Sequence, residues 1–126
     1  MSADQNKDLA FRCFAAINRR DADSLNDVLS PKWAEEIRSW FSTPQLDWAG
    51  RWLEVVDAVA ENDRVWCRVR ASGTQCYGRT DAVGRSWTST SVWFLRITDN
   101  KIVELEWLFD ELGLMRQLGA IITPAL

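Results

Sequence analysis

The chain has 126 residues, with 15 Lys and Arg against 18 Asp and Glu, and a formal net charge of −3. This length predicts one domain, spanning residues 1–126, whose hydrophobic core needs no disulfide or metal for stability. The charge disfavours nucleic acid as a partner, and no apolar run is long enough to span a bilayer. Because the N-terminus is polar and unlike a secretory signal, we expect a cytoplasmic protein with no membrane partner.

Two residue counts restrict the chemistry: the chain has no histidine and eight tryptophans. Without histidine, proton transfer near neutral pH falls to a carboxylate or, less often, to Cys, Tyr or Lys. Many tryptophans supply flat apolar surface for a core or for a pocket that takes a ring-shaped ligand. Cys13, Cys67 and Cys76 have no metal-ligand spacing, so we interpret them as reduced thiols and predict no metal site.

The first third of the chain has helical periodicity. Apolar residues recur at three- and four-residue spacing over residues 6–19, which predicts a helix. Asp21 or Asp23 can cap a short second helix that carries Leu25, Val28 and Leu29. Ser30 and Pro31 then begin a third helix, which places Trp33, Ile37, Trp40 and Phe41 on one face.

From Arg51 onward the pattern changes to strands. Four strands are predicted at residues 51–60, 64–78, 86–97 and 101–110, with turns at "END" and "TDNK". A last helix should run from about Glu111 to Gly119. Helices that precede an antiparallel meander indicate an α+β fold, in which a twisted sheet curls around the N-terminal helices and leaves a cone-shaped cavity.

Several short motifs carry a resemblance to a known family. They are Gly73–Gln75 (GTQ), Gly84–Arg85, Arg96–Glu104 (RITDNKIVE), Asp110–Ala120 and the N-terminal stretch Phe14–Pro31. In this order and spacing the chain resembles the SnoaL-like polyketide cyclases of the nuclear transport factor two-like superfamily. The resemblance implies a cone-shaped α+β barrel with an open mouth, a homodimer formed through the sheet, and cofactor-independent closure of a ring by an intramolecular aldol step.

The resemblance also implies catalytic residues. Asp110 matches the acid that moves protons in these cyclases. Gln75 stands where the family often has histidine; it can donate a hydrogen bond to an enolate oxygen but cannot carry a proton. Tyr77, the one tyrosine, lies beside Gln75 and is a candidate proton donor. The alternative for Asp110 is a plain helix cap, because Asp is common before a helix.

Glu106 is a candidate partner for Asp110. In a regular strand Ile102, Glu104, Glu106, Leu108 and Asp110 share one face, so an inward Asp110 would bring Glu106 into the cavity. Two adjacent acids, or burial among aromatic rings, raise the pKa of a carboxyl group toward the range that a general base needs. The alternative is that Glu106 is solvated, beside Arg68 on the neighbouring strand.

Substrate contacts are expected from aromatic residues and one amide. We predict that about three of the tryptophans touch a ligand. The candidate substrate-binding residues are Phe14, Asn18, Trp33, Trp40, Trp87 and Trp93. Asn18 has an alternative role as the C-cap of the first helix, and the ligand is expected to be a hydrophobic polycyclic or polyene small molecule.

Two other functions remain open. Limonene-epoxide-hydrolase-like (LEH-like) enzymes share the superfamily fold and use an Asp-Arg-Asp set, which Arg79, Asp81 and Asp110 imitate in order. The chain could instead be a binding module without chemistry. Our main hypothesis is a cofactor-independent cyclase or isomerase of secondary metabolism, such as antibiotic biosynthesis, acting on a polyketide-like substrate.

Overall fold

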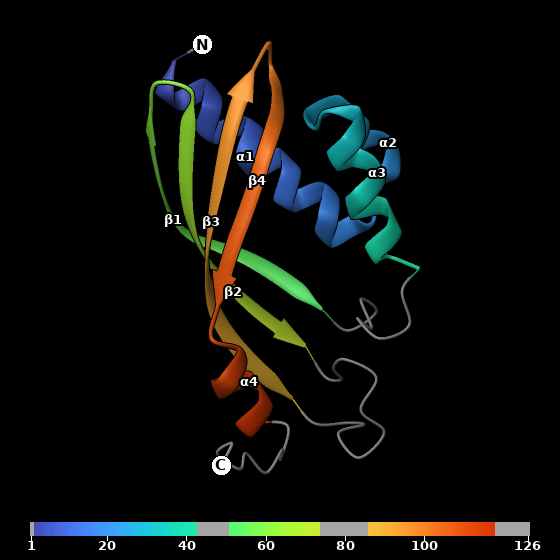
Figure 1. Ribbon diagram of the computed structural model, residues 1–126, viewed down its shortest axis with the longest axis vertical. Helices are drawn as coiled ribbons and strands as arrows, with labels where there is room; N and C mark the ends of the chain where they lie inside the picture. The colour runs from blue at the N-terminus through green and yellow to red at the C-terminus, as the bar shows by residue number, and fades with distance from the viewer. Residues whose placement is uncertain (1, 43–50, 74–85, 118–126) are drawn as a thin grey trace, which may run out of the picture.

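The computed structural model describes residues 2–42, 51–73 and 86–117 (Figure 1). Helix α1 (Ala3–Arg19) begins at Ser2, whose hydroxyl accepts a hydrogen bond from the Gln5 amide at 3.1 Å. The Gln5 side chain accepts one in return from the Ser2 amide at 2.8 Å. This reciprocal cap satisfies two amides that the first helical turn leaves without partners. The predicted apolar stripe is buried, as expected.

Two shorter helices follow. Asp21 caps α2 (Ala22–Val28), and hydrogen bonds from the Ser24 hydroxyl and amide lower the pKa of its carboxyl group. Helix α3 (Pro31–Trp40) begins with proline, whose fixed φ suits the first turn. Ser30 occupies the N-cap position of this helix, but its side chain makes no hydrogen bond there.

The sheet is an antiparallel meander in which each strand pairs with the next along the chain. Its strands, in sheet order, are β1 (Trp52–Glu61), β2 (Arg64–Gly73), β3 (Trp87–Thr98) and β4 (Lys101–Phe109). Asp99 and Asn100, between β3 and β4, both have positive φ, at 50° and 62°. Asp and Asn tolerate this conformation, which two-residue hairpin turns require.

Bulges on the two edge strands help to curve the sheet. One extra residue, Val56, interrupts the pairing of β1 with β2, and Val103 does the same between β3 and β4. A bulge bends its strand and increases the local twist. Figure 1 shows the strands bending strongly along their length, with α1 crossing one face of the sheet.

The hydrophobic core lies between the helices and this inner face of the sheet. It includes the free thiols Cys13 and Cys67, whose pKa values burial raises to about 12 and about 11. These two cysteines therefore stay protonated at neutral pH and act as small apolar side chains. Cys76 lies outside the described residues.

In the described part of the chain, helices followed by a curved, unclosed four-stranded sheet confirm the predicted α+β class. Helix α4 (Glu111–Gln117) follows β4. Its Gln117 side chain binds both backbone groups of Thr88, accepting from the amide at 2.9 Å and donating to the carbonyl at 2.7 Å. Within the described ranges, no helix is long and apolar enough to cross a membrane.

Candidate functional site

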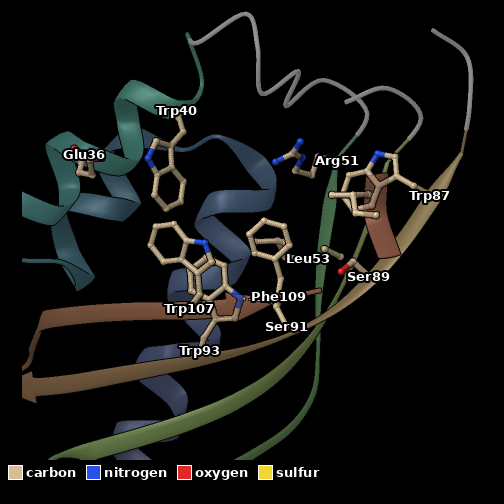
Figure 2. Close-up of a pocket in the computed structure, with 12 residues that line it drawn as sticks. Glu36, Trp40, Arg51, Leu53, Trp87, Ser89, Ser91, Trp93, Trp107 and Phe109 are labelled. Carbon is tan, nitrogen blue, oxygen red and sulfur yellow. Dashed lines mark hydrogen bonds between the residues drawn. The ribbon is translucent and has the colours of Figure 1, made fainter. Parts of the chain in front are cut away.

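A cavity of about 370 Å³ opens at one end of the sheet (Figure 2). Because the strands are antiparallel, the starts of β1 and β3 and the ends of β2 and β4 meet there. Side chains of α3 and α4 complete the lining. The lining residues are Glu36, Trp40, Arg51, Leu53, Ala71, Trp87, Ser89, Ser91, Trp93, Trp107, Phe109 and Leu114. A volume of this size is within the usual range for small-molecule sites, about 300–1,000 Å³.

Small side chains on the inner face of the sheet leave the cavity open. Ala71 pairs with Ser89 across β2 and β3, and Ser91 pairs with Phe109 across β3 and β4. Two residues further along β3, on the same face, Trp93 pairs with Trp107, and the two indole rings fill the space. The cavity therefore begins where the inward residues of β3 change from tryptophan to serine.

An aromatic ladder connects the core with the cavity. Phe14 meets Trp93 edge to face at 5.1 Å, Trp93 stacks on Trp107 at 5.1 Å, and Trp107 meets Trp40 edge to face at 5.0 Å. Each contact of this kind contributes about 0.5–1.5 kcal/mol beyond the burial of area. Rings fixed on both sides form a rigid flat wall, which suits a planar apolar ligand.

The Trp87 ring forms the opposite part of the lining and is 3% exposed. Its ring lies against Gly73, its partner on β2: a Cβ built on that glycine would stand 2.7 Å from Trp87 Cζ2. Glycine therefore makes the inward position of the ring possible. The Arg51 guanidinium carbon lies 5.3 Å from the centre of the same ring, in a cation–π contact.

Two serines supply polar groups to the floor. Ser91 Oγ accepts a hydrogen bond from Trp93 Nε1 at 2.9 Å and donates to the Val69 carbonyl at 3.3 Å, so it fixes the indole. Ser89 Oγ is buried and has no hydrogen-bond partner among the described residues. This hydroxyl therefore has unused hydrogen-bonding capacity beside the cavity.

Asp110 follows the last residue of β4 and is exposed. Its Oδ1 accepts a hydrogen bond from the Gly113 amide at 2.9 Å, and its carbonyl accepts one from Leu114 at 3.1 Å, so it caps α4. The described cavity lining includes the residue before it, Phe109, and Leu114 after it, but not Asp110 itself. The expected burial of this carboxylate is not found, and Asp110 lies at the rim.

The sequence profile of the SnoaL-like polyketide cyclases matches residues 51–118, more than half of the chain. The chain belongs to this family. Among curated proteins, the sequence has no significant match.

Solved structures with the same fold cover nearly all of this SnoaL-like chain. TsrD from Streptomyces laurentii is 26% identical, with a TM-score of 0.76 over 96% of this chain and 99% of TsrD. IdmH from Streptomyces antibioticus, a candidate polyketide cyclase, is 21% identical, with a TM-score of 0.77 over 92% and 99% of the two chains. An LEH-like epoxide hydrolase from M. tuberculosis is 11% identical, with a TM-score of 0.70 over 92% and 86%. At these identities the last two show a shared fold alone.

Glu106 lies on the face of the SnoaL-like sheet that points away from the cavity. It is exposed and pairs with Phe94, whereas its neighbour Trp107 lines the cavity. The bulge at Val103 is the reason: it puts Ile102 and Leu105 on the same inner face and turns Glu104 and Glu106 outward. The predicted location of Glu106 inside the cavity is therefore corrected.

Three of the six predicted substrate-binding residues line the cavity: Trp40, Trp87 and Trp93. The other three are placed elsewhere. Phe14 is buried in the core behind Trp93, and Trp33 packs against that core from α3. Asn18 binds both backbone groups of Leu53, donating to its carbonyl at 2.7 Å and accepting from its amide at 2.8 Å. This amide therefore fixes the start of β1 and does not cap α1.

The remaining predicted site residues, Gln75, Tyr77, Arg79 and Asp81, lie outside the described residues. Trp107, Phe109 and Arg51 line the cavity without having been predicted there. The alternation of β4 places Trp107 and Phe109 on one face, which could have predicted both. We assumed that Asp110 points inward, and this assumption put them on the opposite face. Within the described ranges, no cluster of His, Cys, Asp or Glu is placed to hold a metal ion.

Proposed function

We propose that this SnoaL-like protein is a cofactor-independent cyclase or isomerase that closes a ring in a polyketide-like substrate by an aldol-type step. The observation that carries the proposal is the cavity in which stacked tryptophans stand over a floor of alanine and serine. Membership of the SnoaL-like family supports it.

The cavity suits the folding of a flexible, partly aromatic chain. The stacked pair Trp93 and Trp107 forms an apolar side of the cavity, and the small side chains of Ala71 and Ser89 leave room for a second segment of the same ligand. Holding two reacting carbons of one molecule in contact converts a slow encounter into a favourable intramolecular step. A rigid apolar wall also excludes water from the enolate that forms.

Asp110 is the proposed proton carrier. It lies at the rim, between Phe109 and the helix that bears Leu114, so a substrate that extends from the cavity would reach it. Capping uses Oδ1, and a carboxylate has lone pairs left on both oxygens for a carbon acid. Gln75 and Tyr77 are the proposed donors to the enolate oxygen, a contribution of about 3 kcal/mol when donors are well placed.

Proton exchange tests this role without knowledge of the natural substrate. The probe is 2-acetonaphthone in D₂O, and NMR follows loss of the methyl protons next to the carbonyl. We expect the protein to accelerate exchange, and Asp110→Asn to reduce this acceleration about a hundredfold or more. Asparagine caps a helix about as well as aspartate, so the fold should be retained. Glu111→Gln, the same charge change one residue later, is the control.

Equal exchange by wild type and Asp110→Asn would end the role proposed for Asp110. With a ketone that can cyclise, mass spectrometry separates reaction classes. Ring closure leaves the mass unchanged, or lowers it by one water if dehydration follows. The epoxide alternative is tested in the same way, because hydrolysis of an epoxide adds one water.

A second candidate function is ligand binding without chemistry. It is favoured by the exposure of Asp110 and by its hydrogen bond to a backbone amide, which are properties of a structural cap. Saturable binding of 2-acetonaphthone with no accelerated exchange, and no turnover of cyclisable ketones, would establish this function in place of the cyclase.

A further inference from the structure

We propose that Arg51 and Ser89 form an oxyanion-binding subsite at one end of the cavity, which selects ligands that carry a carboxylate or an ionised phenol on a flat apolar framework. The inference rests on the proposed function, since it assigns the substrate class of the same cavity. It needs the cavity to bind a ligand, but it does not need Asp110 to be the base.

The position of Arg51 is fixed from two sides. It precedes β1, and the two hydrogen bonds between Asn18 and Leu53 hold the backbone two residues further on. The guanidinium lies 5.3 Å from the centre of the Trp87 ring, and that ring is buried against Gly73. Figure 2 shows the guanidinium directed toward the space between Trp40 and Trp87.

Ser89 supplies a neutral donor on the same side. Ser89 lines the cavity. It pairs with Ala71 across β2 and β3, and Ala71 pairs with Leu53, which is two residues after Arg51, so Ser89 lies on the Arg51 side of the cavity. Its buried Oγ has no hydrogen-bond partner among the described residues. A buried hydroxyl without a partner is costly, and a ligand oxygen would remove that cost.

The charges of the lining are separated along the cavity. Glu36 on α3 lies on the far side of Trp40 from Arg51 and Ser89, as Figure 2 shows. In Figure 2 the stacked rings of Trp93 and Trp107 lie below the space between Glu36 and Arg51. A ligand with an oxyanion at one end and a flat apolar body would place the anion at Arg51, since Glu36 repels it at the other end.

Calorimetric titration with two matched probes tests the subsite. 2-Naphthoate carries a negative charge at pH 7, and 2-naphthamide has the same ring system and nearly the same shape without the charge. We expect wild type to bind naphthoate about tenfold or more tightly than naphthamide, the usual effect of a charged hydrogen bond. Arg51→Gln should bind the two probes equally, with naphthamide affinity nearly unchanged.

Further variants separate the subsite from general charge effects. Arg70→Gln removes the same charge from the outer face of β2 and should keep the preference for naphthoate. Ser89→Ala should weaken naphthoate about fivefold. Arg51→Lys keeps a charge but loses the planar fork, so it should keep part of the preference. If Arg51→Gln does not fold in a thermal melt, the wild-type probe ratio and the lysine variant decide.

Equal affinity of wild type for both probes, absence of measurable naphthoate binding, or an unchanged probe ratio in Arg51→Gln would each overturn the subsite. These readouts involve no turnover. Loss of the subsite with retained proton exchange leaves the proposed function standing, and a retained subsite without exchange leaves a binding protein for aromatic anions.

Discussion

Gly73 and Trp87 face each other across the β2–β3 pair at a distance that admits no side chain on the glycine. In Gly73→Ala we expect the indole to leave its inward position, because a methyl group would meet its rigid ring. Overpacking of this kind costs about 1–3 kcal/mol of unfolding free energy. Urea unfolding measures the loss.

Ser72→Ala is the matched control for Gly73→Ala, since it lies next along β2, and it should be nearly neutral. Naphthamide affinity of the alanine variant at 73 should fall as well, because Trp87 lines the cavity. An unchanged unfolding free energy for Gly73→Ala would mean that Trp87 can move without cost.

Individual site residues could be predicted from sequence only where the local backbone is regular. Trp87 and Trp93 are both inward because β3 alternates without a bulge between them. Asp110 follows the end of β4, where alternation no longer applies, and its carboxylate turns to the amide of Gly113. The sequence is consistent with two roles for Asp110, a buried catalytic acid and a helix cap. Only the structure shows that the side chain is exposed at the edge of the cavity.

At the level of elements, Asn18 joins α1 to β1 through two hydrogen bonds with the backbone of Leu53. Asn18→Ala leaves one amide and one carbonyl without partners, at a cost of about 1–3 kcal/mol each when buried. We expect a lower midpoint of urea unfolding. Asn18→Asp, which keeps an acceptor and loses the donor, should lie between the two.

Asn26→Ala, on the exposed side of α2, is the control for the Asn18 variants. It loses only a long, exposed hydrogen bond from Arg38 at 3.5 Å, so the midpoint should change little. If Asn18→Ala unfolds at the wild-type midpoint, the contact contributes nothing net to stability.

Helices and strands were predictable because their apolar periods of about four and of two residues are long and clear. The bulges were not, since Val56 and Val103 resemble their β-branched neighbours and nothing in their side chains requires an extra residue. A bulge reverses the facing of every residue beyond it, so alternation counted from Ile102 gives the wrong face for Glu106. The placement of Glu106 in the cavity also depended on an inward Asp110, whereas Asp110 is exposed and caps α4.

At the scale of the whole molecule, the outer face of the sheet exposes a group of large apolar side chains. Trp66 is 49% exposed and packs against Phe94 at 4.7 Å, and Leu108 is 75% exposed. Val59 and Val92 lie beside them in the register. Apolar surface gathered in this way is typical of an interface.

We predict a homodimer formed through this face. Leu108→Asp should convert it to a monomer, because a charge at the centre of an apolar contact would be buried without a partner. Sedimentation velocity at micromolar concentration measures the change. Phe11→Ser, on the exposed side of α1, should remain dimeric, and a monomeric wild type at that concentration would remove the claim.

Topology and class were predictable for the whole described chain, because each strand pairs with its neighbour in sequence and the motifs fix their order. The cavity was expected only in outline. Its location depends on Ala71, Ser89 and Ser91 meeting across three strands, and that meeting depends on register, which single-strand patterns do not specify.

The aromatic ladder gives the cavity an optical property. Indoles stacked at 5.1 Å with an angle of 21° between their planes, as Trp93 and Trp107 are, share their electronic transitions. The pair therefore contributes a dichroic band of its own in the ultraviolet, distinct from the signal of isolated tryptophans. The same two rings line the cavity, so a ligand that binds beside them should change this circular dichroism band. Binding can therefore be followed by the ultraviolet circular dichroism of the protein without an added label.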